Sequence, residues 1–275
     1  MWDNPVKQHT VPCSYLQWFC DKINSRDSRD SKITQYIVKQ DKVIPEIKIS
    51  NCSIIKDFYT FIDKDWNLNY EIENWFWIDI ESINHIIKKI NDKIKLNDNE
   101  LANISVFIWF QSFRTAWSND WIWLNKELFL TQLWEGAKMI SDIIIWSNLY
   151  IFNNNKWNYI TSNYCMKLIK SKTYKYLPTM WLWLWNSDIW FPLSKNSYLY
   201  ILQKNKYQYT LRTNNQIEYI DDNYDLYKIF NQYSYSNKSN ELYWKNKEIM
   251  DNVTLWKDKN NVTIQRKLDE ILSFY

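Results

Sequence analysis

The chain has 275 residues, with 34 Lys and Arg against 31 Asp and Glu, so its formal net charge is only +3. A charge this close to balance does not by itself indicate a nucleic-acid-binding protein. The length fits one domain, 1–275, with sub-lobes expected at 1–75, 76–146 and 147–275. No stretch approaches the ~20 apolar residues that cross a membrane, and polar residues rather than a secretory signal follow Met1. We therefore expect a soluble, cytoplasmic protein.

The tryptophan content is unusual, because 18 Trp accompany a single Gly. Average composition predicts roughly 19 Gly in a chain of this length. Trp66, Trp157 and Trp244 lie in polar stretches between apolar runs, where turns favour Gly because it adopts positive φ freely. We hypothesise that most Trp stand for UGA codons that the source organism reads as Gly. Under this hypothesis the segment MWLWLW at 180–185 becomes MGLGLG. The alternative is a truly Trp-rich protein.

The first half of the chain predicts a hairpin followed by helices. A short helix is expected at 10–21. Alternating β-branched and polar residues at 33–38 and 43–49 predict a β-hairpin. From 79 to 96, Ile recurs at spacings of three and four, which is the period of an amphipathic helix. A second helix, 100–114, follows N-cap candidates at 97–99, and its nearly continuous apolar surface predicts that it is buried.

The second half predicts one more helix and then mainly strands. The helix is expected at 124–145, and under the recoding hypothesis residues 134–136 become Gly-Glu-Gly, which would favour a kink or a break there. A second hairpin is expected from 149–152 and 159–162. The remaining expected elements are strands at 198–202, 207–212 and 217–220 and helices at 225–233 and 262–272. The predicted fold class is α+β, with an N-terminal β-hairpin, a central helical group, a later antiparallel sheet and C-terminal helices.

Three features are candidates for chemistry. His9 could act as a general base, a general acid or a phosphate ligand, although a lone His is more often structural. Arg114 ends an apolar helix, where a guanidinium needs a carboxylate or an anionic ligand, so structural pairing and anion binding both stay open. The segment 167–176 interleaves Lys with Tyr in a way that suits single-stranded nucleic acid, but a solvated strand or loop face is favoured.

The four cysteines do not indicate a metal site. They form no CxxC pair and have no His cluster nearby, so free thiols in a reducing cytosol are expected: Cys13, Cys20, Cys52 and Cys165. The residues identify no cofactor, and we assign no metal ligand.

Five ordered blocks carry a family resemblance. They are Gln8-His-Thr-Val-Pro12 with Tyr15, Lys56-Asp-Phe-Tyr59, Phe110-Gln-Ser-Phe-Arg114, Tyr159-Ile-Thr-Ser-Asn163 and Phe191-Pro-Leu-Ser194. Together they resemble the uncharacterised, mainly bacterial family DUF4238, whose members typically begin with a QHYVPxxYLxxF-like signature and later carry an SDxP-like segment followed by PLS.

The resemblance implies a set of site residues. Carried over position by position, it points to Gln8, His9, Pro12, Tyr15, Arg114, Ser162, Pro192 and Ser194. Two departures matter, because Thr10 stands where an aromatic residue is usual and Asn163 replaces the Asp of the SDxP-like segment. If that Asp were a general base or a metal ligand, Asn163 would lack the charge to replace it.

Two functions fit these residues. The first is an intracellular hydrolase acting on nucleic acid or nucleotides, with a role in phage defence. His9 and Arg114 would be catalytic in it, and its substrate-binding residues would be Gln8, Tyr15, Ser162, Asn163 and Ser194. The alternative is a non-catalytic module that binds nucleic acid or protein. Catalysis requires His9, Arg114 and Ser162 to converge on one accessible pocket, whereas the alternative allows them to be scattered or sealed in the core. The oligomeric state stays open.

Overall fold

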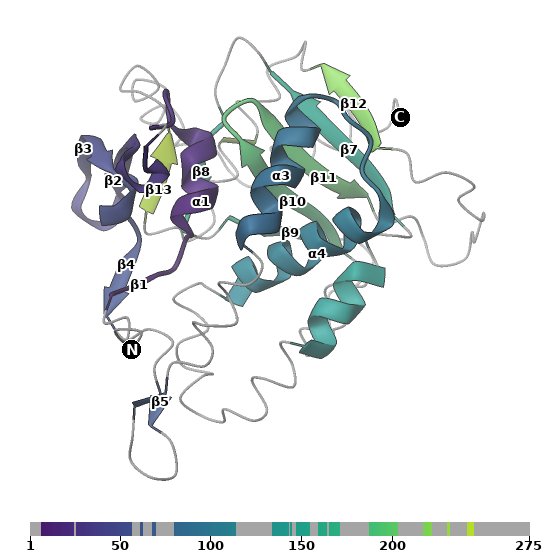
Figure 1. Cartoon of the computed structure of the whole chain (residues 1–275), viewed down its shortest axis with the longest axis horizontal. Coiled ribbons are helices and arrows are strands. Elements are labelled where there is room, and N and C mark those ends of the chain that lie inside the picture. Colours follow the sequence, from purple (N-terminus) through teal and green to yellow (C-terminus); the bar gives the residue numbers. More distant parts are fainter. Residues whose placement is uncertain are drawn as a thin grey trace.

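The structure, a computed structural model, is an α+β protein, which confirms the predicted fold class (Figure 1). It describes residues 7–24, 26–56, 61–62, 68–69, 80–113, 134–142, 144, 147–154, 159–163, 165–170, 187–202, 217–221, 230–231 and 241–244. The predicted elements at 207–212 and 262–272 lie outside these residues, as do most of 225–233 and the first part of 124–145. Residues 230–231, within the predicted helix 225–233, are helical.

One sheet has four antiparallel strands in the order β3-β2-β13-β8. The predicted N-terminal hairpin is confirmed as β2 (Lys32–Ile37) and β3 (Lys42–Lys48). Asp41 makes the turn between them with φ 48°, a left-handed conformation that Asp tolerates better than most residues. β13 (Glu241–Trp244), far along the chain, pairs with β2 on one side and with β8 (Thr161–Ser162) on the other.

The second sheet has five strands in the order β12-β7-β11-β10-β9. These are β12 (Ile217–Asp221), β7 (Asn148–Asn153), β11 (Ser197–Leu202), β10 (Ser187–Ser194) and β9 (Lys167–Lys170). All neighbours are antiparallel except β12, which runs parallel to β7, so the later sheet is mixed rather than purely antiparallel. Two ribbons of two strands complete the described strands: β1 (Lys7–His9) with β4 (Ile54–Lys56), and β5 (Phe61–Ile62) with β6 (Leu68–Asn69).

The second predicted hairpin is wrong, because β7 and β8 lie in different sheets. The two ends of the connection between them bond to the tight β10–β11 turn instead of to each other. Asn154 N–H donates to the carbonyl of Asn196 at 2.9 Å, and Tyr159 N–H donates to the carbonyl of Lys195 at 2.8 Å. These long-range backbone bonds direct the chain out of one sheet and into the other.

The predicted amphipathic helix is α3 (Ile80–Asn91), which ends earlier than its apolar pattern suggests. Lys93 adopts φ 55°, and its N–H donates to the carbonyl of Ile90 at 3.0 Å. Ile94 N–H donates to the carbonyl of Lys89 at 2.8 Å, which completes a Schellman C-cap with Lys in the position usually taken by Gly. Ile94 therefore lies beyond the helix and is 48% exposed.

The second predicted helix is α4 (Asp98–Phe113), and it is buried as expected. Its N-terminus carries a reciprocal capping box. Glu100 N–H donates to Asn97 Oδ1, and Asn97 N–H donates to a carboxylate oxygen of Glu100, both at 2.9 Å. Residues 134–142 are also helical, so no break occurs at Gly136.

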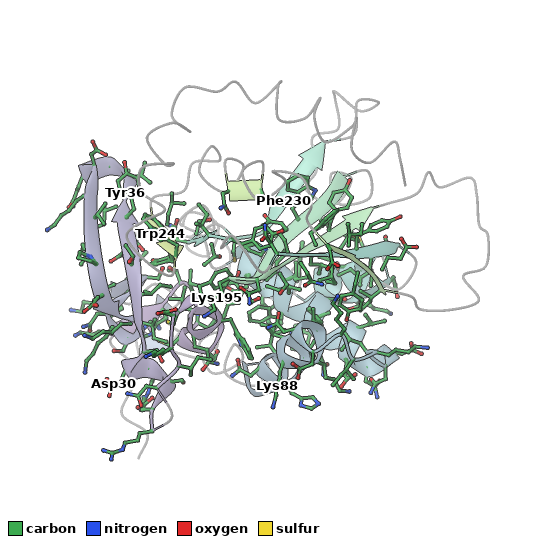
Figure 2. The ribbon with its side chains drawn as sticks, turned by 90° about the horizontal axis from the view of Figure 1, so that it is seen from above. Asp30, Tyr36, Lys88, Lys195, Phe230 and Trp244 are labelled. Atoms are coloured by element: carbon green, nitrogen blue, oxygen red, sulfur yellow. The ribbon has the colours of Figure 1, made fainter. Side chains whose placement is uncertain are left out.

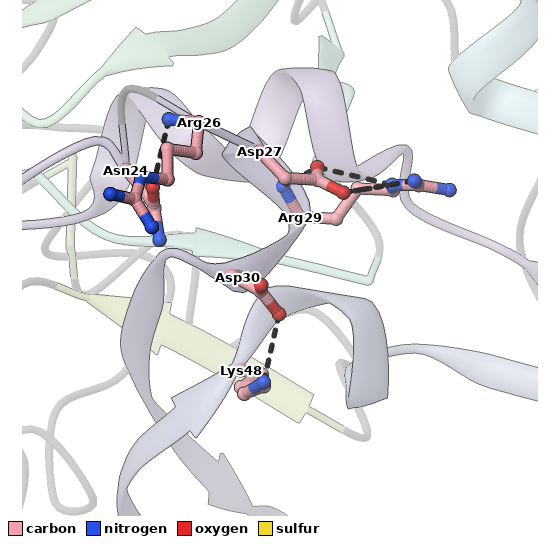
Figure 3. A network of polar contacts seen from close by, with 6 residues as sticks. All are labelled: Asn24, Arg26, Asp27, Arg29, Asp30 and Lys48. Carbon is pink, nitrogen blue, oxygen red and sulfur yellow. Dashed lines mark hydrogen bonds and ion pairs between the residues drawn. The ribbon is translucent and has the colours of Figure 1, made fainter.

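The N-terminal helical region consists of α1 (Cys13–Leu16) followed by a 3-10 turn, η1 (Gln17–Phe19). Further 3-10 turns are η2 (Ser28–Asp30), η3 (Val38–Gln40) and η4 (Ile49–Asn51). Around η2, Arg29 pairs with Asp27 at 2.9 Å and Lys48 pairs with Asp30 at 2.8 Å (Figure 3). These pairs are largely exposed, so each contributes little stability.

The core is rich in aromatic residues. Tyr15 of α1 lies 5.7 Å from Phe107 of α4 and 5.4 Å from Phe191 of β10, measured between ring centroids, so it joins helices to the five-stranded sheet. On that sheet Phe230 stacks on Tyr198 with a centroid separation of 4.5 Å. Figure 2 labels Phe230 over these strands and Trp244 within the four-stranded sheet.

The described Trp residues bear on the recoding hypothesis. Among the described residues, the non-Gly residues with positive φ are Asp41, Glu46, Ser53 and Lys93. None is Trp, so positive φ gives no reason for Gly at the five described Trp positions. Trp244 also lies in a strand, fully buried, rather than in the turn expected for it. Its indole nitrogen has no hydrogen-bond partner among the described residues.

Candidate functional site

The first predicted site residues lie on the β1–β4 ribbon. Lys7 is directly opposite Lys56, and His9 is opposite Ile54. Alternate residues of a strand point to opposite faces, and directly opposed residues share a face. Lys7, His9 and Lys56 therefore lie on one face, where both lysines are exposed and His9 is half-buried. Gln8 points to the other face and is fully buried.

The turn at residues 50–53 holds the histidine. His9 Nε2 lies 3.2 Å from the carbonyl oxygen of Ser50. A carbonyl can only accept, so Nε2 carries the proton in this bond and Nδ1 is the acceptor nitrogen of the neutral ring. The next residue, Thr10, donates to the carbonyl of Ser53 from its N–H at 2.8 Å and from its hydroxyl at 3.2 Å.

A polar cluster joins this turn to β13. The single hydroxyl proton of Ser53 is shared between Glu241 Oε2, which lies 3.3 Å from Oγ, and the hydroxyl oxygen of Tyr243. The Tyr243 hydroxyl in turn donates to Glu241 Oε2. Ser53 and Tyr243 are buried, whereas Glu241 is half-buried at the margin of the cluster. Ser53 has φ 52°, which costs a residue with a Cβ about 1–2 kcal/mol, so these bonds hold a strained turn.

Burial fixes the protonation state of the phenol and of a neighbouring thiol. The pKa of Tyr243 is raised well above its usual value, first by burial and then by the charge of Glu241 and the hydrogen bond to it. Tyr243 therefore stays protonated and donates. The pKa of Cys52 is also raised, first by burial and then by Glu241. A thiol with a raised pKa is a poor nucleophile.

Asn163 holds the main chain of Glu241. Its N–H donates to the Glu241 carbonyl, and its side-chain Oδ1 accepts from the Glu241 N–H, both at 3.2 Å. Asn163 is half-buried, whereas its neighbour Ser162, opposite Leu242 in the sheet, is 1% exposed. Asn163, where the resemblance implies an Asp, therefore lies directly beside the carboxylate-bearing Glu241.

Tyr15 connects three of the resemblance blocks inside the core. Its hydroxyl donates to the carbonyl of Pro192, and it lies 3.0 Å from Thr161 Oγ1, which is then the donor to Tyr15. Burial raises the pKa of the Tyr15 phenol well above its usual value, so the hydroxyl keeps its proton. Tyr15 is fully buried, and these bonds join α1 to β8 and β10.

Ser194 is also part of a buried hydrogen-bond network. Its Oγ donates to Asn91 Oδ1 at 3.1 Å and lies 2.7 Å from Ser197 Oγ. Ser197 Oγ donates to the same Asn91 oxygen at 2.7 Å. The network fastens the β10–β11 turn to the last residue of α3.

Other candidates are separate from this region or lie outside the described residues. Arg114 lies outside the described residues, and so do residues 171–176 of the basic aromatic segment. Residues 167–170 of that segment form β9. In the described part of the chain, no group of three or more His, Cys, Asp or Glu residues could hold a metal ion. No helix there is both long enough and apolar enough to span a membrane.

All four cysteines are free thiols, as predicted. Burial, the largest influence, raises the pKa of Cys13 to about 11 and that of Cys20 to about 12.

The site therefore combines predicted and unpredicted residues. His9 bonds to the 50–53 turn at one end of the polar cluster, and Asn163 bonds to the main chain of Glu241 at the other. The other predicted residues that the structure describes are buried: Gln8, Tyr15, Ser162 and Ser194. Sequence reasoning missed three members: Ser53, Glu241 and Tyr243. No local signal marks them, because Ser53 meets Glu241 across 188 positions of sequence.

The fold and this site define an α+β protein with a polar cluster between an N-terminal ribbon and a late strand. Residues 7–133 match the family described as "Protein of unknown function (DUF4238)". The family prediction is thus confirmed for that part of the chain, which includes Gln8, His9, Tyr15 and Arg114. Neither the curated proteins nor the solved structures gave a match.

Proposed function

We propose that this chain is an intracellular hydrolase of nucleic acids or nucleotides in which His9 transfers the proton. The observation that carries the proposal is the exposed pair Lys7 and Lys56, directly opposed on the same face as His9. Like charges directly opposite each other destabilise an antiparallel pair. A bound phosphate would remove this repulsion and would lie beside a group suited to acid–base chemistry near neutral pH.

In the proposed reaction the two lysines would bind the substrate, and His9 would transfer the proton. The two lysines would hold the phosphate as point charges without reading a base, so binding would be independent of sequence and sensitive to salt. His9 would take or give a proton through Nδ1, because Nε2 is engaged with the carbonyl of Ser50. Arg114 would supply a further phosphate contact, as its family position suggests.

A second candidate, a non-catalytic module that binds nucleic acid, is favoured by a specific observation. Four residues carried over as substrate-binding are nearly or fully buried: Gln8, Tyr15, Ser162 and Ser194. Such residues support the fold rather than contact a substrate. In this alternative the lysine pair binds the phosphate backbone, and His9 only anchors the 50–53 turn.

The deciding experiment measures cleavage of labelled RNA and DNA, with and without divalent metal. The chain has two histidines, and His85 is exposed on α3, which makes it a matched control. We expect His9→Ala to abolish cleavage and His85→Ala to leave it unchanged. Replacing both Lys7 and Lys56 with Ala should weaken binding and lower the salt dependence by roughly two phosphate contacts.

One result would overturn the hydrolase, and another would overturn only the role of His9. Salt-dependent binding without cleavage by the folded wild-type protein would support the binding module instead. Cleavage that persists in His9→Ala would remove His9 from the reaction. The expected role in phage defence is a further proposal, tested by comparing plaque formation on cells that express the wild-type protein or His9→Ala.

A further inference from the structure

A continuous chain of contacts links Glu241 to His9. Tyr243 donates its hydroxyl proton to Oε2 of Glu241, and Ser53 Oγ shares its one proton between this carboxylate oxygen and the hydroxyl oxygen of Tyr243. Ser53 is the last residue of the turn whose first residue, Ser50, accepts from His9 Nε2. The carbonyl of Ser53 also accepts from the N–H and the hydroxyl of Thr10, which directly follows His9. The turn is therefore held by β13 on one side and holds the histidine on the other.

The cluster is suited to fixing the position of this turn. Tyr243 is fully buried and Ser53 is 4% exposed, so their bonds are shielded from competing water. Bonds to a carboxylate are stronger than neutral ones. The left-handed φ of Ser53 persists only where surrounding contacts hold it, and these bonds are such contacts.

Asn163 fixes the strand end that carries the carboxylate. Its two hydrogen bonds to the N–H and carbonyl of Glu241 extend the β8–β13 pairing by one residue. An Asp at position 163 could accept from the same N–H through a carboxylate oxygen. The replacement of the family's Asp by Asn therefore preserves this contact.

We propose that Glu241, with Tyr243 and Ser53, is a positioning group for His9: it fixes the 50–53 turn so that the Ser50 carbonyl selects the Nε2–H form of the ring. This inference rests on the proposed function, in which Nδ1 of His9 transfers the proton. Asn163 acts one step further away by holding the main chain of Glu241.

The test observes the tautomer of His9 directly, by 15N NMR of the histidine rings in the full-length protein. His85→Ala assigns the two signals. We expect the wild-type ring to be predominantly the Nε2–H form, and Glu241→Ala to shift the ring toward a mixture of both forms. Glu241→Gln should restore the wild-type state, because its amide oxygen still accepts from Tyr243 and Ser53. Asn163→Asp should likewise keep it, whereas Asn163→Ala should weaken it.

Kinetics on the cleaved substrate provide the second measurement. Displacing a proton-transfer group by about 1 Å can cost up to 100-fold in rate. We therefore expect Glu241→Ala to lower kcat about 10- to 100-fold and to leave KM within about twofold, since the lysines are untouched. Ser14→Ala is the control, because the Ser14 hydroxyl has no hydrogen-bond partner among the described residues.

The outcomes separate this inference from the proposed function. An unchanged tautomer of His9 in Glu241→Ala overturns the positioning role, even if the wild-type protein is a nuclease. A shifted tautomer in a protein that cleaves nothing supports the positioning of His9 and overturns the hydrolase. A shifted tautomer with unchanged kcat overturns the link between the positioning group and the reaction.

Discussion

The hydroxyl of Tyr15 lies 3.0 Å from Thr161 Oγ1, across 146 positions of sequence, and donates its own proton to the carbonyl of Pro192. Both contacts are buried, so removing the hydroxyl would leave two partners unsatisfied. We expect Tyr15→Phe to lower the free energy of unfolding by about 1–3 kcal/mol. Urea unfolding measures this loss.

Tyr219→Phe is the matched control for this substitution. The Tyr219 hydroxyl is shielded from solvent and has no hydrogen-bond partner among the described residues. Its removal should therefore leave the free energy of unfolding unchanged or slightly higher. Equal losses in Tyr15→Phe and Tyr219→Phe would show that the Tyr15 bonds add nothing to stability.

The Asn91 network makes a second prediction about stability. Asn91 Oδ1 accepts from both Ser194 and Ser197, so Asn91→Ala should cost about 1–3 kcal/mol. Asn91→Asp keeps an oxygen acceptor and should cost less. Thermal unfolding of the two variants compares them. A loss in Asn91→Asp as large as that in Asn91→Ala would contradict a role based on this acceptor.

The sequence predicts the elements whose signals are local. The hairpin β2–β3 and the helices α3 and α4 follow from periodicity and caps, such as Asn97 with Glu100. The pairing of β13 with β2 and β8 could not be predicted from the sequence, because a strand of four residues carries too little pattern to indicate a distant partner. In the candidate site, too, only the residues that belong to local motifs could be predicted from the sequence. His9 and Asn163 were found through motifs, whereas Glu241 reaches the site only through that long-range pairing.

The cysteines predict a pH dependence. Burial raises the pKa of Cys13 to about 11 and that of Cys20 to about 12, so their neutral forms are favoured in the folded protein. Their contribution to stability is therefore fully present below the unfolded pKa of about 8.5 and is lost progressively as the pH rises from there through the folded values of about 11 and 12. Urea unfolding at pH 8 and at pH 10.5 should show lower stability at the higher pH.

The rate of alkylation provides a second test of the burial of these thiols. At pH 8 a thiol with a pKa near 11 is thiolate about once in a thousand molecules, so native Cys13 should react at least about 100-fold more slowly than the same residue in denaturant. Mass spectrometry of iodoacetamide-treated protein measures the two rates. Similar rates in the native and denatured protein would contradict the burial of these groups.

The recoding hypothesis makes its sharpest prediction where Trp109 meets the chain's one glycine. A Cβ added to Gly136 would lie 2.0 Å from Cζ2 of Trp109, so the indole fills the space above the glycine. Gly136→Ala should therefore destabilise the Trp109 protein, by about 1–3 kcal/mol for overpacking. With Gly at position 109 that space is empty, and Gly136→Ala should instead stabilise the helix by up to about 1 kcal/mol.

A double-mutant cycle on positions 109 and 136 measures this reversal of sign. The additive result, in which Gly136→Ala has the same effect in both backgrounds, would show that the indole does not occupy this space. Mass spectrometry of peptides from the native source then identifies residue 109 itself. If the native residue is Gly, the indole is absent from the native core and the space above Gly136 is open, as the stabilising effect of Gly136→Ala in that background would indicate. If it is Trp, the buried ring is native at that position and the recoding hypothesis is wrong there.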